Sequence, residues 1–130
     1  MDSHLHVRAV SPNRVAGAVV GACYVLIGVA GLTVSMITGF AEESHLFVFQ
    51  LNPLHNLLHL ALGTVLGLAA YRGVRHATLV NAGAGVCYGL LGVLGLLLGA
   101  GVNPLDLSGP DNVLHLATAV GLLGISAARK

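Results

Sequence analysis

Histidines, asparagines and one aspartate interrupt two hydrophobic stretches of this sequence in a similar pattern. The first stretch opens with the run Asn-Pro-Leu-His-Asn-Leu-Leu-His, which ends at His59. In the second, Asn112 and His115 repeat the spacing of Asn56 and His59. Imidazole nitrogens are ligands for zinc, copper and haem iron, and two of them at matching depth in a helical bundle could share one ligand. The pattern therefore directs attention to metal or cofactor binding.

The composition indicates that these polar residues lie within a membrane. Of the 130 residues, 55% are hydrophobic and 8% are charged, and the mean hydropathy is +0.85. A soluble domain needs more charged side chains than this to cover its surface. The formal net charge of +1 argues against nucleic-acid binding, which requires a basic face. We therefore expect an integral membrane protein that does not bind nucleic acid.

Four uncharged runs are long enough to span a bilayer, which takes about 20 helical residues at about 1.5 Å each. The predicted spans are about 13–37, 53–71, 77–98 and 110–127. A cytoplasmic tail over 1–12 precedes them, and a tight turn over 72–76 joins the second span to the third. Asn52 and Pro53 should begin the second helix, as its N-cap and first residue. The sequence thus predicts a single membrane domain over 1–130, an all-α, four-helix transmembrane bundle.

The charged residues predict the orientation of this bundle. Basic residues precede the first helix, lie between the second and third, and follow the fourth. The acidic residues of the loops fall in the other two connections: Glu42, Glu43, Asp106 and Asp111. Basic loops stay on the cytoplasmic side of a membrane. We therefore expect both chain termini in the cytoplasm.

The first and third predicted helices carry matching residues. Gly21 and Tyr24 in the first correspond to Gly85 and Tyr88 in the third, and small residues follow one side of each helix. Together with the repeated histidines, this predicts two duplicated helical hairpins related as parallel repeats. The small residues allow either close helix packing or space for a flat ligand such as a haem, quinone or carotenoid.

Three interpretations of the histidines are open: structural hydrogen bonds, haem ligation and metal binding. In the first, the histidines form structural hydrogen bonds across the bundle to asparagines or tyrosines. In the second, His59 and His115 are the axial ligands of a haem b between diagonally opposed helices. The other residues expected at this cofactor site are Asn56, Asn112, Tyr24 and Tyr88.

The third interpretation is a divalent metal site near the outer face. Two histidines one turn apart on a helix suit zinc or copper, and a carboxylate could complete the site. The expected ligands are His55, His59, His115 and Asp111. No nucleophile has a base at a recognisable spacing, and no phosphate-binding loop is present in the sequence, so we do not expect an enzyme.

The chain resembles a bacterial family of small four-helix membrane proteins that is known only as a domain of unknown function. The matching residues are the run from Asn52 to His59, then Gly63 and Gly67, and finally Asn112 with His115. The resemblance covers about residues 14–128. It implies a multi-pass protein of the bacterial cytoplasmic (inner) membrane, and it implies no activity or ligand.

The function expected from these features is that of a non-enzymatic accessory or structural subunit of a membrane complex. Such a subunit would contact the lipid bilayer and either another membrane protein or a second copy of itself. The small-residue grooves of the first and third helices offer surfaces for this contact. Small residues along the fourth helix offer another: Ala117, Gly121, Gly124 and Ala128. The alternative is a cofactor-binding protein that holds haem or a divalent metal in the histidine and asparagine layer.

Overall fold

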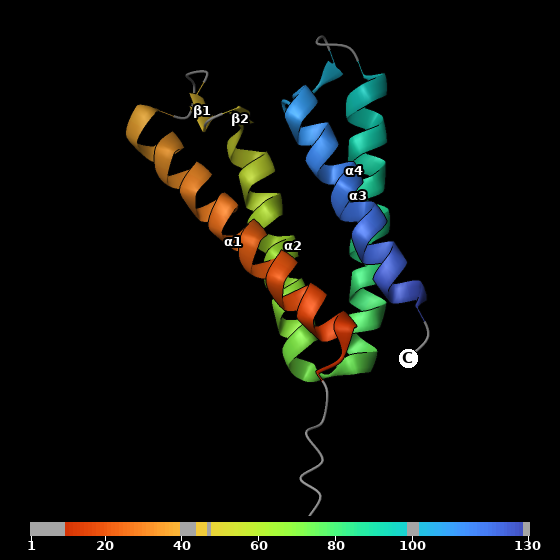
Figure 1. Ribbon diagram of the computed structural model, residues 1–130. Helices are drawn as coiled ribbons and strands as arrows, with labels where there is room; N and C mark the ends of the chain where they lie inside the picture. The colour runs from red at the N-terminus through yellow and green to blue at the C-terminus, as the bar shows by residue number, and fades with distance from the viewer. Residues whose placement is uncertain (1–9, 40–43, 47, 99–101, 129–130) are drawn as a thin grey trace, which may run out of the picture.

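A computed structural model describes residues 10–39, 44–46, 48–98 and 102–128. Within these residues the chain forms four helices and one small β-hairpin (Figure 1). The helices are α1 (Pro12–Thr38), α2 (Pro53–Arg72), α3 (Val74–Leu97) and α4 (Gly109–Ala127). Between α1 and α2, strands β1 (Ser44–Leu46) and β2 (Phe49–Leu51) pair antiparallel. The predicted tail up to residue 9, the acidic residues Glu42 and Glu43, and the basic residues Arg129 and Lys130 lie outside the described residues.

The prediction of four helices is confirmed. Helices α1, α2 and α3 are each long and apolar enough to cross a membrane. Helix α4 has 19 residues and is the shortest of the four. The β-hairpin was not predicted, and its two strands have only three residues each. The described helices are therefore those of a small membrane protein.

Local hydrogen bonds explain where α2 and α4 begin. The side chain of Asn52 accepts hydrogen bonds from the backbone N–H groups of Leu54 and His55, at 2.9 and 3.1 Å, and a proline follows it, as predicted. In α4, the N–H of Asp111 donates to the Ser108 hydroxyl at 3.4 Å, and the N–H of Ser108 donates to the Asp111 carboxylate at 3.0 Å. Both caps place histidines within the first two turns of the helix that they start.

The connection between α2 and α3 is shorter than the predicted turn. Only Gly73 separates the two helices, and Arg75 and His76 already belong to α3. Gly73 has φ 130° and ψ 176°, a conformation that glycine adopts without a steric penalty. Its N–H donates to the last turn of α2, and its carbonyl accepts from the first turn of α3. A single residue therefore reverses the chain.

The helices form two close pairs, α1 with α2 and α3 with α4 (Figure 1). In the first pair the backbones meet at Gly21 and Gly63. A Cβ atom on either glycine would lie 2.7 Å from the carbonyl oxygen of the other, so any larger residue would push the helices apart. The small residues of α1 thus face α2, which favours close packing over the alternative of a groove for a flat ligand.

The core lies where the two helix pairs meet, and all four helices contribute to it. Its buried members are Tyr24, Leu66, Ala84, Tyr88, Ala119 and Leu122. Many large apolar side chains point outward instead, and Leu26, Ile37 and Val120 are between 69% and 80% exposed. Water would not solvate such a surface, whereas lipid chains would.

Candidate metal centre

Three buried imidazole rings converge between the two helix pairs. His55 and His59 come from α2, one turn apart, and His115 comes from α4. The Nε2 atom of His115 lies 3.3 Å from that of His55 and 3.2 Å from that of His59. One ligand atom from each ring lies within 4.8 Å of the others. The exposed fractions of the three residues are 1%, 3% and 0%, so protein covers the cluster.

Two tyrosines lie against the imidazole rings. The ring of Tyr24, from α1, meets His59 edge-on with centroids 4.8 Å apart. The ring of Tyr88, from α3, stacks on His115 with centroids 5.6 Å apart and on Tyr24 with centroids 4.5 Å apart. All four helices therefore contribute to the cluster, two with histidines and two with tyrosines. Both tyrosines were predicted at the cofactor site with His59 and His115, and not among the metal ligands.

Hydrogen bonding among the imidazoles leaves part of their capacity unused. A neutral imidazole nitrogen either donates one hydrogen bond or accepts one along its in-plane lone pair. The Nε2 atom of His115 faces two other Nε2 atoms and can satisfy one of those contacts. The Nδ1 atoms of His59 and His115 are also buried without a hydrogen-bond partner among the described residues. An unsatisfied buried nitrogen is costly. An ion among the Nε2 atoms would resolve the contact that His115 Nε2 cannot satisfy, but it would not provide a partner for the two Nδ1 atoms.

A tetrahedral metal ion fits this arrangement of nitrogen atoms. With metal–nitrogen distances of about 2.0 to 2.1 Å, two ligands of a tetrahedral ion lie about 3.3 to 3.4 Å apart. The two measured separations, 3.2 and 3.3 Å, are close to that value. The third separation, between the ligand atoms of His55 and His59, is at most 4.8 Å, so a shift of up to about 1.5 Å would bring it to the same length. The cluster therefore has the donor atoms and nearly the spacing of a three-histidine metal site.

A bis-histidine haem fits less well. Its axial nitrogen atoms lie about 4 Å apart on opposite faces of a flat ring that separates the two imidazoles. Here the Nε2 atoms of His59 and His115 are in direct contact at 3.2 Å. The space beside the imidazoles is filled by Tyr24 and Tyr88, and the glycines of α1 pack against α2. The geometry thus favours an ion over a macrocycle.

Asp111, a metal ligand in the prediction from sequence, lies outside the group of converging ligand atoms. It is 2% exposed, and its Oδ2 atom accepts hydrogen bonds from the N–H and the hydroxyl of Ser108 at 3.0 and 2.5 Å. These bonds hold the carboxylate in the N-terminal cap of α4. The structure therefore gives Asp111 the role of a cap, one turn from His115.

Asn56 and Asn112 also take a different place from the one expected. Each lies inside one helix pair: the side chain of Asn56 packs against Gly31, and that of Asn112 packs against Gly95. Both asparagines are at most 3% exposed. Asn56 Nδ2 and Asn112 Oδ1 have no hydrogen-bond partner within the described part of the chain. The recorded hydrogen bonds of the imidazoles join histidine to histidine, and Tyr24 bonds instead to the hydroxyl of Thr118 at 2.9 Å.

A second buried polar cluster, which was not predicted from the sequence, lies at the opposite end of the bundle. The side-chain amide of Asn81 donates to the backbone and side-chain oxygens of Asn13, at 2.9 and 3.1 Å. Asn13 in turn donates to the carbonyl of Ile125 at 3.2 Å. This cluster joins α1, α3 and α4. Its signal in the sequence is the asparagine at position 81, where the first half of the chain has Gly17.

A protein-family model matches the chain over residues 14–128, a range that includes most of α1 and all of α2, α3 and α4. Its description is "Domain of unknown function (DUF4383)". No curated protein and no solved structure matches the chain. The matched range contains the three histidines of the cluster, and the description assigns no role to any of them.

Proposed function

The chain belongs to the family described as Domain of unknown function (DUF4383), and we propose that it is a membrane protein that binds one divalent metal ion between its two helix pairs. The ligands are the Nε2 atoms of His55, His59 and His115. Zinc is the ion whose tetrahedral preference and short metal–nitrogen distance fit best, and copper or nickel could compete for the same imidazoles.

One observation supports this proposal above the others: three buried imidazoles, in the first two turns of α2 and α4, bring one nitrogen each to within 4.8 Å of one another. Polar side chains at membrane depth are costly and need partners, and these three cannot satisfy one another completely. An ion accepts all three lone pairs at once. Each Nδ1 then carries the remaining proton of its ring, and those of His59 and His115 have no acceptor among the described residues.

The role we propose for the ion is structural, and no reaction is proposed at it. Because none of the three histidines is more than 3% exposed, a substrate would reach the ion only after the helices moved. The tyrosine rings of α1 and α3 cover the cluster from the side. The ion would therefore fasten α2 to α4, as structural zinc fastens the elements of small domains.

Metal analysis of the purified protein tests this proposal. The full chain should be produced without a polyhistidine tag, solubilised in mild detergent and analysed by inductively coupled plasma mass spectrometry. We expect about one metal ion per chain in the wild type, and a loss of most of it in His115→Ala. His76→Ala is the matched control, because His76 is exposed in the first turn of α3. Equal metal content in wild type and His115→Ala would overturn the proposal.

An absorption spectrum of the same preparation separates the metal ion from haem. Cobalt(II) in place of the native ion should give the visible bands of tetrahedral coordination in the wild type and in His76→Ala. A Soret band after haem supplementation, lost in His59→Ala, would instead favour the haem alternative.

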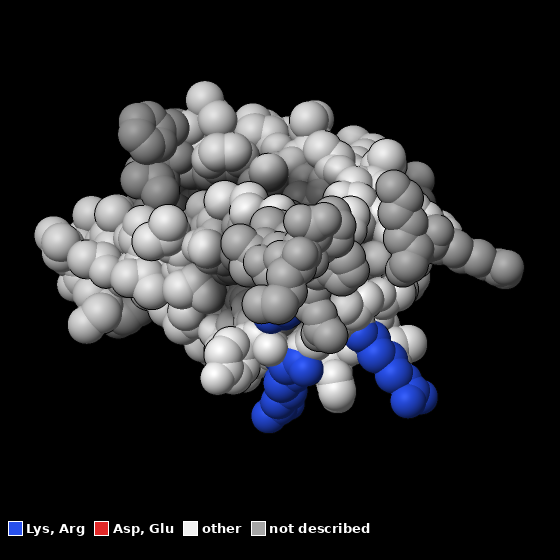
Figure 2. Space-filling view, turned by 60° about the horizontal axis from the view of Figure 1, so that its bottom comes forward, with Lys and Arg blue, Asp and Glu red and all other residues white. Residues whose placement is uncertain are grey.

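We also propose that four spans cross the bacterial cytoplasmic membrane with both termini in the cytoplasm. The start of α1, the end of α2 and the start of α3 carry Arg14, Arg72 and Arg75, and Figure 2 shows arginine side chains gathered at this end. Asp106 and Asp111 belong to the other end, where α4 begins. This distribution supports the orientation through the preference of basic residues for the cytoplasmic side. Fusions at the C-terminus test it: a fluorescent protein should be active there and alkaline phosphatase inactive.

Repeated contacts support the proposal that the chain is a duplicated helix pair. Gly31 of α1 lies against the side chain of Asn56 in α2, and Gly95 of α3 lies against Asn112 in α4. Gly31 and Gly95 are a matching pair between the two halves of the sequence, and so are Asn56 and Asn112. Two parallel repeats would place the histidines of α2 and α4 at similar depth, as a shared ligand requires.

A second candidate function is that of an accessory subunit that binds another transmembrane helix through α4. Gly121 and Gly124 are exposed, and a Cβ atom on either would meet no other atom within 4 Å. Helices associate in lipid through such small-residue surfaces. Copurification after mild solubilisation tests this role: a partner protein should be retained by the wild type and lost from Gly121→Leu, and a monomer without any partner would count against it.

A further inference from the structure

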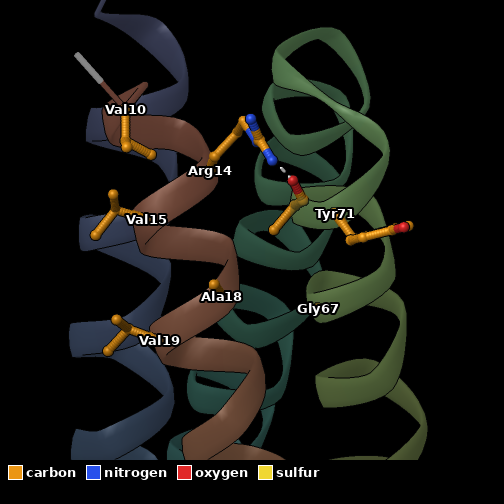
Figure 3. Close-up of a pocket in the computed structure, with 8 residues that line it drawn as sticks. Val10, Arg14, Val15, Ala18, Val19, Gly67 and Tyr71 are labelled. Atoms are coloured by element: carbon orange, nitrogen blue, oxygen red, sulfur yellow. Dashed lines mark hydrogen bonds between the residues drawn. The ribbon is translucent and has the colours of Figure 1, made fainter. Parts of the chain in front are cut away.

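An apolar groove lies between α1 and α2, near the end of the bundle that carries the arginines, whereas the histidine cluster lies near the other end of α2. Its volume is about 400 Å³. Figure 3 shows Arg14 at one end of it, reaching from α1 toward α2, with Ala18 of α1 and Gly67 of α2 farther along. Tyr71, on α2 at the same end, is exposed, and its ring points away from Arg14. The groove thus has one cationic end and an apolar body.

Arg14 is held in place but keeps most of its hydrogen-bonding capacity. Its Nε donates to the carbonyl of Ala70 at 2.8 Å, which fixes the guanidinium across the helix contact. A guanidinium has five N–H donors, so the terminal amino groups remain available. No carboxylate among the described residues forms an ion pair with Arg14. Phosphate is the anion that such a planar, fixed donor group binds well.

The body of the groove has room for a hydrocarbon chain. A Cβ atom on Gly67 would meet no other atom within 4 Å, so open space lies above this glycine. Val15 and Val19, on the α1 side, are 47% and 57% exposed. Tyr71, at the end of α2, is 85% exposed, and tyrosine is common at the level of lipid headgroups. The cationic end therefore lies where headgroups would be, and the apolar body extends from it toward the middle of the bilayer.

We propose that this groove binds one anionic phospholipid from the leaflet on the arginine side. The terminal amino groups of Arg14 hold the phosphate, and one acyl chain lies along α1 and α2 over Gly67. Arg72 and Arg75 add positive charge at the same end, and Figure 2 shows no acidic side chain among the described atoms of that face. This charge favours an anionic headgroup over a zwitterionic one, whose ammonium group it would repel.

Native mass spectrometry of the full chain in detergent, titrated with phosphatidylglycerol or phosphatidylcholine, tests the proposal. We expect one phosphatidylglycerol per chain, bound about tenfold more tightly than phosphatidylcholine. Arg14→Gln should weaken binding at least about tenfold, because charge-assisted hydrogen bonds are lost. Gly67→Leu should weaken it similarly by filling the groove. Arg75→Gln is the comparison variant for Arg14→Gln: Arg75 is an exposed arginine at the same end that does not line the groove, so its loss removes one nearby charge and should weaken binding clearly less than Arg14→Gln does. Gly83→Leu is the matched control for Gly67→Leu, because Gly83 is another glycine with open space around it.

Each outcome of this titration decides the proposal. If Arg14→Gln and Arg75→Gln weaken phosphatidylglycerol binding equally, the lipid is attracted to the basic end in general, and the proposed site is overturned. Displacement of the lipid by millimolar inorganic phosphate would show a site for free phosphate and would also overturn it. Should Gly67→Leu fail to fold, judged by its thermal unfolding, the comparison of the two arginine variants decides alone.

Discussion

The Nε2 atoms of His59 and His115 lie 3.2 Å apart although the two residues belong to different helix pairs. As a hydrogen bond, this contact requires one nitrogen to carry a proton and the other to offer a lone pair. If both nitrogens instead bind one metal ion, each must offer a lone pair and neither carries a proton. The second arrangement also accommodates His55, whose Nε2 lies 3.3 Å from that of His115. A metal ion at this point would join α2 directly to α4.

Zinc should stabilise the protein through His115. A ligand that binds only the folded state adds about 2.7 kcal/mol at a concentration 100 times its dissociation constant, enough to raise the unfolding temperature by several degrees. We expect this rise for the wild type in detergent, its reversal by a chelator, and no rise for His115→Ala. Differential scanning fluorimetry with and without zinc measures it. His76→Ala should behave as the wild type, and a full response of His115→Ala would contradict the site.

Ser108→Ala and Asp111→Ala should destabilise the protein without changing its metal content. Loss of an N-terminal cap costs about 0.5 to 2 kcal/mol, and both residues belong to one capping box. Their effects should therefore be less than additive in the double variant. Thermal unfolding and metal analysis, carried out on the same preparations, check the two halves of this prediction. If Asp111→Ala loses the ion and Ser108→Ala keeps it, Asp111 is a metal ligand after all.

The two buried tyrosines should respond differently to removal of their hydroxyl groups. Tyr24 shares a hydrogen bond with Thr118, so Tyr24→Phe should cost about 0.5 to 1.5 kcal/mol. The hydroxyl of Tyr88 is buried without a partner among the described residues, so Tyr88→Phe should be neutral or stabilising. Equilibrium unfolding of the two variants in one detergent measures the difference. The opposite ranking would show that the hydroxyl of Tyr88 has a partner.

Gly31→Ala and Gly95→Ala should each destabilise one helix pair. A Cβ atom at these positions would overlap the side chains of Asn56 and Asn112, which are buried and have little freedom to move. Overpacking of this kind costs about 1 to 3 kcal/mol. Gly121→Ala is the control, since the space beside Gly121 is open and alanine favours the helix by up to about 1 kcal/mol. Similar unfolding temperatures for all three variants would contradict the packing described here.

Much of the helical framework follows from local chemistry and could be predicted. Uncharged runs of sufficient length predict the helices, and Asn52 with its proline predicts the start of α2 because both act within one turn. The connection at Gly73 was harder to predict. Whether a glycine ends one helix and begins another depends on its φ angle, and the neighbouring Arg75 and His76 look like loop residues. The β-hairpin has too few residues to show an alternating pattern.

The candidate site was predicted in part. The spacing of His55 and His59 places both on one face of a helix, and the repeated pattern predicts that His115 lies at a similar depth. The partners of the other polar residues depend on contacts that spacing does not determine. Asp111 bonds to its own helix cap, and Asn56 lies against a glycine inside its own helix pair. Residue type identified the polar layer, and only the packed structure separates its members by role.

Gly73 also determines how the two halves of the bundle can move. Because a single residue connects α2 to α3, neither helix pair can slide along its axis without pulling the other with it. The remaining freedom is a hinge rotation, in which the angle between the two helix pairs changes about this glycine. His55 lies about 27 Å from that pivot along α2, so a rotation of about 5° would displace it by about 2 Å. The imidazoles thus lie far from the hinge, where a small change in the angle between the helix pairs produces a large change in the distances between them.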